Sequence, residues 1–248
     1  MSAWTLWRVF ARSLFLQASW NPQGMQNLGL AYALFPALKA LYPDPERQMA
    51  AVRRHMVFFN TQPYMAAAIL GGVLFHESRI ARGEEPPEKV VSFKAALMGP
   101  LAALGDGFFW LSLRPALGAF CAALVPLLQE WAAVLFLVLY NAVHLTLRAR
   151  LFRMGLLLGD RLVEAVAHAQ LPAWGARLRT VGAASAGGAV AYLSMSLGAN
   201  QGGQVGNLLA GGYLGLGVLA YWLVSKRFGN YALLYLAASL AVAAGAFL

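Results

Sequence analysis

The residues best suited to hold a polar ligand lie in the run Phe58-Phe59-Asn60-Thr61-Gln62-Pro63-Tyr64. Asn60, Thr61 and Gln62 supply neutral hydrogen-bond donors and acceptors, and aromatic side chains flank them. This combination suits a sugar, whose hydroxyl groups need both kinds of partner and whose ring has an apolar face. The alternative, which the local sequence favours, is that the run only caps the start of a helix, with Pro63 in its first turn.

A second candidate site centres on Asp106, the only acidic residue between Glu88 and Glu130. A carboxylate inside an apolar span is costly, so it is a functional candidate by default. Arg114 follows on the same stretch and could pair with it. An equally weighted alternative is that Asp106 caps the next helix, or that the pair only fixes a turn. The candidate contacts for substrate or for another subunit are therefore Asn60, Thr61, Gln62, Asp106, Trp110 and Arg114.

The remaining reactive residue types form no recognisable catalytic or metal-binding pattern. His55, His76, His144 and His168 have no HExxH spacing and no neighbouring cysteine cluster, so we expect ordinary surface roles for them. The single cysteine, Cys121, excludes a disulfide within the chain and a cysteine-based zinc site. Phosphate-loop, nucleophile-elbow and dinucleotide-binding fingerprints are also missing. We therefore predict no catalytic residue, no metal ligand and no cofactor.

The elements that position these residues must be membrane helices. Of the 248 residues, 60% are hydrophobic and 12% are charged, whereas about 25% are charged in a typical soluble domain. Four apolar runs each approach the roughly 20 residues that a helix needs to cross a bilayer. They are Trp131–Leu147, Val181–Ala199, Leu208–Val224 and Tyr231–Leu248. We predict an all-α, multi-pass integral membrane protein.

The basic residues predict the orientation of these helices. The net charge of +9 fits either nucleic acid or an anionic membrane surface. The arginines cluster in residues 148–179, while the loop 200–207 is uncharged. By the positive-inside rule, the 148–179 loop is cytoplasmic and the C-terminus is outside, which accounts for the charge without nucleic acid. The arginines of that loop are Arg148, Arg150, Arg153, Arg161, Arg177 and Arg179.

The first half has shorter apolar runs with polar interruptions. Asn21-Pro22 and Asp44-Pro45 are typical helix starts. The charged stretch 77–89 is predicted to be a loop in water, and Gly105–Gly107 a turn. Half-length apolar pieces around such turns indicate re-entrant or discontinuous helices, which survive at membrane depth only when buried or lining a wet cavity. Such helices form substrate sites in transporters.

Three regions follow from this pattern. Residues 1–20 are predicted to contain an amphipathic helix at the membrane interface, because arginines interrupt its apolar residues. Residues 21–130 form the core region with helix breaks, and residues 131–248 form the transmembrane helical scaffold. Glycines recur every fourth residue at Gly198, Gly202 and Gly206, a spacing that favours close packing against another helix.

Several runs, in their order and spacing, resemble one known family. They are Met25–Gly29, Tyr32–Leu38, Arg54–Pro63, Met98–Ala102, Gly105-Asp106, Phe109-Trp110, Arg114-Pro115, Asn141 and Tyr221–Leu223. Together these runs are similar to the IID component of the mannose/fructose/sorbose family of the bacterial phosphotransferase system. Two positions depart from the family pattern. Gln62 stands where the family usually has histidine, and Gly107 where it usually has proline.

The resemblance implies a membrane subunit of the bacterial plasma membrane that is not itself an enzyme. Such a subunit pairs with a IIC subunit to move a mannose-type hexose, while phosphoryl groups pass from phosphoenolpyruvate through histidines of IIA and IIB to the sugar. Trimers of the IIC–IID pair are the implied assembly. One alternative is a regulatory or degenerate IID-like subunit without sugar uptake. Another is an autonomous transporter or channel, against which the glycine-spaced helices argue because they need a partner surface.

Overall fold

The computed structural model describes residues 1–201, 211, 212 and 215. Its described part contains helices and no strands, which confirms the all-α prediction. Two compact units divide the chain, Met1–Ala183 and Ala184–Leu248. The candidate sites described below belong to the first unit. The apolar runs Leu208–Val224 and Tyr231–Leu248, the glycines Gly202 and Gly206, and the predicted C-terminal side lie outside the described residues.

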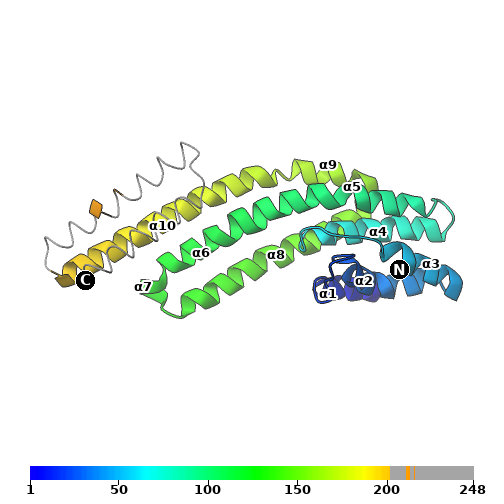
Figure 1. Cartoon of the computed structure of the whole chain (residues 1–248), viewed down its shortest axis with the longest axis horizontal. Coiled ribbons are helices and arrows are strands. Elements are labelled where there is room, and N and C mark those ends of the chain that lie inside the picture. The colour runs from blue at the N-terminus through cyan, green and yellow to red at the C-terminus, as the bar shows by residue number, and fades with distance from the viewer. Residues whose placement is uncertain (202–210, 213–214, 216–248) are drawn as a thin grey trace. The chain divides into compact units, whose positions relative to one another are not determined.

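Three helices form the N-terminal part: α1 (Ala3–Ser13), α2 (Asn27–Leu41) and α3 (Pro45–His55) (Figure 1). The predicted start at Asp44 is confirmed, because its carboxylate accepts the Arg47 N–H at 2.8 Å and Pro45 opens α3. The predicted start at Asn21 is wrong. The Asn21 side chain accepts the Gly24 N–H at 2.8 Å and closes a turn ahead of α2.

Helices α4 (Ala66–Ala81) and α8 (Trp131–Leu158) pack with their backbones in close approach. A Cβ added at Gly155 would lie 2.1 Å from the Ala68 carbonyl oxygen. One added at Gly71 would lie 2.1 Å from the Phe152 carbonyl oxygen. Only glycine leaves room for this contact. Helix α4 also extends past the predicted apolar run and carries Glu77, which is buried, so this residue does not lie in a water-exposed loop.

One unbroken helical stretch follows, made of α5 (Glu88–Gly105), a π-helical segment η1 (Asp106–Leu113) and α6 (Arg114–Ala123). The predicted turn at Gly105–Gly107 is therefore wrong. The chain widens into a π-helix instead of breaking, and Ser112 stabilises the wider turn by donating from Oγ to the Gly107 carbonyl at 2.7 Å. Short π-helical segments inside α-helices are frequent at functional sites.

The remaining described helices are α7 (Val125–Leu128), the 3₁₀ turn η2 (Gly159–Arg161), α9 (Leu162–His168) and α10 (Leu171–Gln201). Residues 148–179 are thus largely helical, so their prediction as a loop is wrong. Arg148 is buried and donates to the Ser13 carbonyl. The other five arginines are exposed: Arg150, Arg153, Arg161, Arg177 and Arg179. Arg179 on α10 donates to Ser112 Oγ at 2.7 Å and ties α10 to η1.

Two stretches of the described chain are long and apolar enough to be candidate membrane spans, Glu88–Ala123 and Trp131–Tyr192. The two longest non-helical segments of the first half are residues 14–26 and 56–65. That the half-length apolar pieces of the first half form re-entrant helices remains a prediction.

Candidate functional site

The two non-helical segments lie beside each other and are joined by hydrogen bonds. The Gln26 N–H donates to the Phe59 carbonyl at 2.8 Å, and the Phe59 N–H donates to the Gly24 carbonyl at 3.3 Å. The Gln26 side chain adds two bonds to Thr61, donating to its carbonyl at 2.8 Å and accepting its N–H at 3.1 Å. Residues remote in sequence therefore form one short, strand-like pair.

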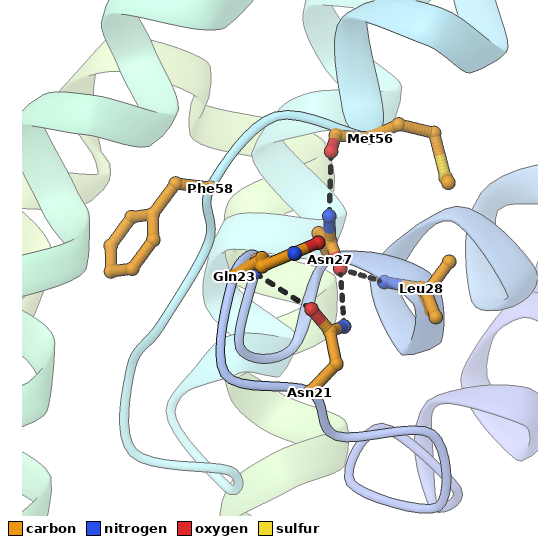
Figure 2. A pocket seen from close by; sticks show the side chains of 7 residues that line it. Asn21, Gln23, Asn27, Leu28, Met56 and Phe58 are labelled. Carbon is orange, nitrogen blue, oxygen red and sulfur yellow. Dashed lines mark hydrogen bonds between the residues drawn. The ribbon is translucent and has the colours of Figure 1, made fainter.

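A pocket of about 520 Å³ opens where these segments meet the start of α2 (Figure 2). Asn27 holds it together: its Nδ2 donates to the Met56 carbonyl at 2.6 Å, and its Oδ1 accepts the Leu28 N–H at 2.7 Å and Asn21 Nδ2 at 3.1 Å. The lining residues are Asn21, Gln23, Gly24, Asn27, Leu28, Met56 and Phe58.

Two lining side chains remain available to a ligand. Gln23 makes no side-chain hydrogen bond within the described part of the chain, so its amide can donate and accept. Phe58 also lines the pocket, and its aromatic ring is 54% exposed. The pocket carries no charged side chain. Its chemistry suits a neutral ligand with hydroxyl groups and an apolar face.

The predicted residues Asn60, Thr61 and Gln62 lie next to this pocket but do not line it. Asn60 is exposed, whereas Thr61 and Gln62 are buried. Thr61 Oγ1 donates to the Met98 carbonyl at 3.0 Å. Gln62 Oε1 accepts the N–H groups of Tyr64 at 2.8 Å and Met65 at 2.9 Å, so it caps the entry to α4. For Gln62, this is the capping role that the local sequence favours.

The predicted pair of Asp106 and Arg114 does not form. Asp106 is exposed, and no ion pair within the described residues includes it. The Arg114 guanidinium instead lies over the Trp110 ring at 5.9 Å. The two residues of the expected pair stand at opposite ends of η1, and a full π-helical segment separates them.

The two predicted motifs nevertheless meet through Tyr64. Its ring lies 5.5 Å from Trp110 and 4.8 Å from Phe109, both in η1. On α8, His144 stacks on Tyr64 at 4.4 Å, and the Tyr140 hydroxyl lies 3.3 Å from the Tyr64 hydroxyl. The surface role expected for His144 is wrong, because packing against Tyr64 leaves it 8% exposed.

A buried carboxylate forms the second polar centre, and sequence reasoning missed it. Glu77 accepts two hydrogen bonds from Arg54, at 2.6 and 2.8 Å. It also accepts one from the Tyr42 hydroxyl at 2.7 Å and one from His55 Nε2 at 2.8 Å. Lys94 Nζ donates to the Arg54 carbonyl at 2.8 Å. This Glu77 network joins the C-terminal end of α2 with α3, α4 and α5, and its member His55 directly precedes Met56 in the sequence.

The pKa values of two groups in this network, Glu77 and His55, are lowered in the folded chain. Burial alone would raise the pKa of Glu77, but hydrogen bonds from Arg54 and His55 outweigh it and lower that pKa to about 2. Burial lowers the pKa of His55 to about 4. Glu77 is therefore charged and His55 neutral near pH 7. The surface roles expected for His55 and His76 are wrong, since both are fully buried; His76 Nδ1 lies 2.7 Å from Glu85.

Comparisons with known proteins show the family of this chain. The family model for the PTS system mannose/fructose/sorbose family IID component matches residues 1–247. The PTS system mannose-specific EIID component of Escherichia coli K12 is 42% identical over 142 residues, 56% of this chain and 50% of that protein. The sorbose-specific EIID component of Lacticaseibacillus casei is 38% identical over 161 residues, 64% of this chain and 57% of that protein. The chain spans about half the length of the curated relatives it matches.

Solved structures agree with the sequence comparison. A chain in the cryo-EM structure of the mannose transporter ManYZ with microcin E492 has a TM-score of 0.62 and 28% identity, over 99% of this chain and 97% of that chain. Another, described as the structure of a membrane protein, has a TM-score of 0.74 with the same identity and coverage. Because the family model spans nearly the whole sequence, this chain belongs to the IID components of the mannose/fructose/sorbose family of the phosphotransferase system.

Proposed function

We propose that this chain is the IID subunit of a sugar-translocating unit in the bacterial plasma membrane. It pairs with a IIC subunit and helps a mannose-type hexose to cross, while the IIA and IIB carriers bring the phosphoryl group from phosphoenolpyruvate. The chain itself does not catalyse phosphoryl transfer. The observation that supports this proposal best is the uncharged, amide-lined pocket held by Asn27, a residue of the family motif, against the Arg54–Pro63 segment.

The pocket matches the chemistry of a hexose. The Gln23 amide can donate to one sugar hydroxyl and accept from another. The exposed face of Phe58 can cover the C–H face of the ring, since aromatic rings bury apolar surface without needing a polar partner. Asn60 is exposed two residues further along the same segment and can extend the contact. Asn21 and Asn27 are occupied by internal bonds and hold the pocket's shape.

Reconstitution in vesicles with the cognate IIC, followed by addition of phosphorylated IIB, tests the function. Sugar-dependent loss of phosphate from IIB, with sugar phosphate as product, supports a transport subunit. Assembly with IIC but no sugar-dependent turnover supports the regulatory alternative. Transport by the chain without IIC supports an autonomous carrier.

The same assay tests the pocket. Gln23→Ala should raise the sugar concentration needed for half-maximal turnover at least several-fold, because it removes a donor and an acceptor. Gln17→Ala is the matched control, since Gln17 is an exposed glutamine that does not line the pocket. Unchanged sugar dependence in Gln23→Ala and Phe58→Ala would assign the sugar contacts to the partner subunit.

The membrane arrangement completes the proposal. The chain is multi-pass with its C-terminus outside, and the arginine-rich residues 148–179 face the cytoplasm, where basic side chains meet anionic lipid. The IIC–IID pairs assemble as trimers. The mass of the detergent-solubilised complex, measured by light scattering with correction for detergent, tests this stoichiometry.

A further inference from the structure

Arg114 forms no ion pair with any carboxylate in the described part of the chain. The sequence contains 10 Asp and Glu residues, and all of them lie in the described part, between Asp44 and Glu164. The ion pairs that these carboxylates make do not include Arg114. Residues 202–248 contain no acidic side chain that could reach it. None of the acidic side chains of the described residues therefore neutralises Arg114.

The position of Arg114 along its helix makes this lack of a partner important. Arg114 lies in the membrane-crossing stretch Glu88–Ala123, nine residues before its end. At about 1.5 Å per residue, it stands about 14 Å from the end of α6. Half the thickness of a bilayer's hydrocarbon core is about 15 Å. If the exposed Gln129-Glu130 turn lies at the membrane surface, Arg114 is near the bilayer midplane, too deep for lipid phosphates.

The structure holds this guanidinium outward. Arg114 is exposed and makes no hydrogen bond within the described residues, so its five N–H donors are open. The Cζ atom of Arg114 lies 5.9 Å from the centre of the Trp110 ring. The centre of the Trp110 ring lies 5.5 Å from the centre of the Tyr64 ring. The face of an aromatic ring attracts a cation, but this contact does not use the N–H donors in the plane of the guanidinium. This leaves the fork of donors open to a planar acceptor such as a carboxylate.

An apolar groove begins one helical turn from Arg114. It has a volume of about 400 Å³ and lies between α6 and α8. Small residues on both helices, among them Gly118, Ala122 and Ala133, let another helix approach closely. On α8 the groove reaches Phe136, whose ring stacks on Tyr140 at 5.7 Å. The groove and the open guanidinium thus occupy neighbouring positions on the pair α6–α8.

We propose that this α6–α8 groove receives one membrane helix of the IIC subunit, and that an Asp or Glu of that helix pairs with Arg114. Small and apolar side chains of the IIC helix fill the groove, and its carboxylate accepts two hydrogen bonds from the guanidinium. The choice of IIC as the partner rests on the proposed function. The depth of Arg114 favours a protein carboxylate over a lipid headgroup.

Co-purification from detergent tests the proposal with the full chain and a tagged IIC subunit. Arg114→Glu should lower the amount of chain recovered with IIC at least tenfold, because two carboxylates would then face each other. Replacing one intramembrane carboxylate of IIC by arginine should restore recovery only in the Arg114→Glu background. Arg150→Glu is the matched control, because Arg150 is exposed near the far end of α8 and does not line the groove.

A cross-link provides a second measurement that does not depend on the folding of Arg114→Glu. In a Cys121→Ser background, Leu137→Cys should form a disulfide with a cysteine placed on the same IIC helix that carries the rescuing carboxylate. Leu137 lines the groove and is 58% exposed. Val163→Cys, on α9 and 54% exposed, should form none.

Three results would overturn the inference. Normal recovery of Arg114→Glu with lost turnover would make Arg114 a sugar contact. Recovery that varies with the anionic lipid content, and that no IIC substitution restores, would make it a lipid contact. Failure of Leu137→Cys to cross-link to any IIC helix would remove the groove from the interface.

If the wild-type chain does not bind IIC, both this inference and the proposed function fail. If the wild-type chain binds IIC and the complex turns over sugar, the variants test only this inference.

Discussion

At the scale of single residues, burial decides which polar side chains matter. Glu77 lies in a sequence stretch rich in charge, and nothing in that stretch distinguishes it from Glu84 or Glu85. In the folded chain it is fully buried and accepts hydrogen bonds from Arg54, Tyr42 and His55. A buried carboxylate is tolerated only with such partners, because desolvation otherwise disfavours its charge.

Removing the charge of Glu77 should therefore destabilise the protein strongly. Glu77→Gln leaves the Arg54 guanidinium half-buried without a counter-charge, and breaking a buried pair in this way costs about 3 to 5 kcal/mol. Thermal unfolding of the purified protein in detergent measures the loss. Glu84→Gln serves as control, because Glu84 is on the surface and pairs with exposed Arg82. Equal unfolding temperatures for the two variants would contradict a central role for the Glu77 network.

The same network predicts how stability depends on pH. Folding lowers the pKa of His55 from 6.5 to about 4 and the pKa of Glu77 from 4.5 to about 2. In both cases the unfolded chain binds more protons, so stability falls as the pH falls. His55 should contribute a decline between pH 6.5 and 4, and Glu77 a further decline below pH 4.5.

Unfolding temperatures measured from pH 8 to pH 4 test this dependence. His55→Gln should flatten the part of the profile above pH 4.5, while leaving the steeper acidic part in place. A wild-type profile that stays level down to pH 4 would show that His55 remains accessible to protons in the folded chain.

At the scale of elements, glycines determine how closely the long helices pack. Gly71 on α4 and Gly155 on α8 each lie against a carbonyl of the opposite helix. Gly99, in contrast, has no atom within 4 Å of the position where a Cβ would stand. Glycine therefore serves packing at two of these positions and lowers helix stability at the third.

The two kinds of glycine should respond to alanine in opposite ways. Gly155→Ala should destabilise the protein by several kcal/mol, because two backbones must separate to admit the methyl group. Gly99→Ala should leave stability unchanged or raise it by up to about 1 kcal/mol, the difference in helix propensity. Chemical or thermal unfolding in one detergent compares them. Similar effects of both variants would mean that α4 and α8 can adjust their spacing freely.

At the scale of the whole molecule, orientation in the membrane follows from charge. Helix α8 has 28 residues, enough at about 1.5 Å per residue to cross the bilayer with a turn outside. Gln129 and Gln170 lie in the turns before α8 and after α9, and both are exposed. From the basic residues between 148 and 179 we predict that the second turn faces the cytoplasm.

Cysteine accessibility should reveal this orientation. In a Cys121→Ser background, Gln129→Cys should react with an impermeant maleimide added to intact cells. Gln170→Cys should react only in inverted membrane vesicles. Reaction of both from the same side would mean that the span after residue 131 does not cross the membrane, and reversed sides would refute the charge-based orientation.

The sequence by itself determined the class of the protein and much of its helical plan. Apolar runs long enough to span a bilayer predict membrane helices because the backbone must satisfy its own hydrogen bonds there. Asp44-Pro45 marks the start of α3 because capping is a local interaction. The order of the family motifs identified the family that the comparisons show.

Only the tertiary structure decided which residues form the candidate site. The pairing of Gln26 with Thr61 and the burial of Glu77 depend on contacts between distant segments, which local patterns do not encode. Gly105–Gly107 resembles a turn in sequence, yet Ser112 stabilises a π-helix there, and Gly105 lies against Gln62. The expected Asp106–Arg114 pair failed for the same reason. Spacing along the chain suggested proximity, but helix geometry separated the charges and turned Arg114 outward onto Trp110.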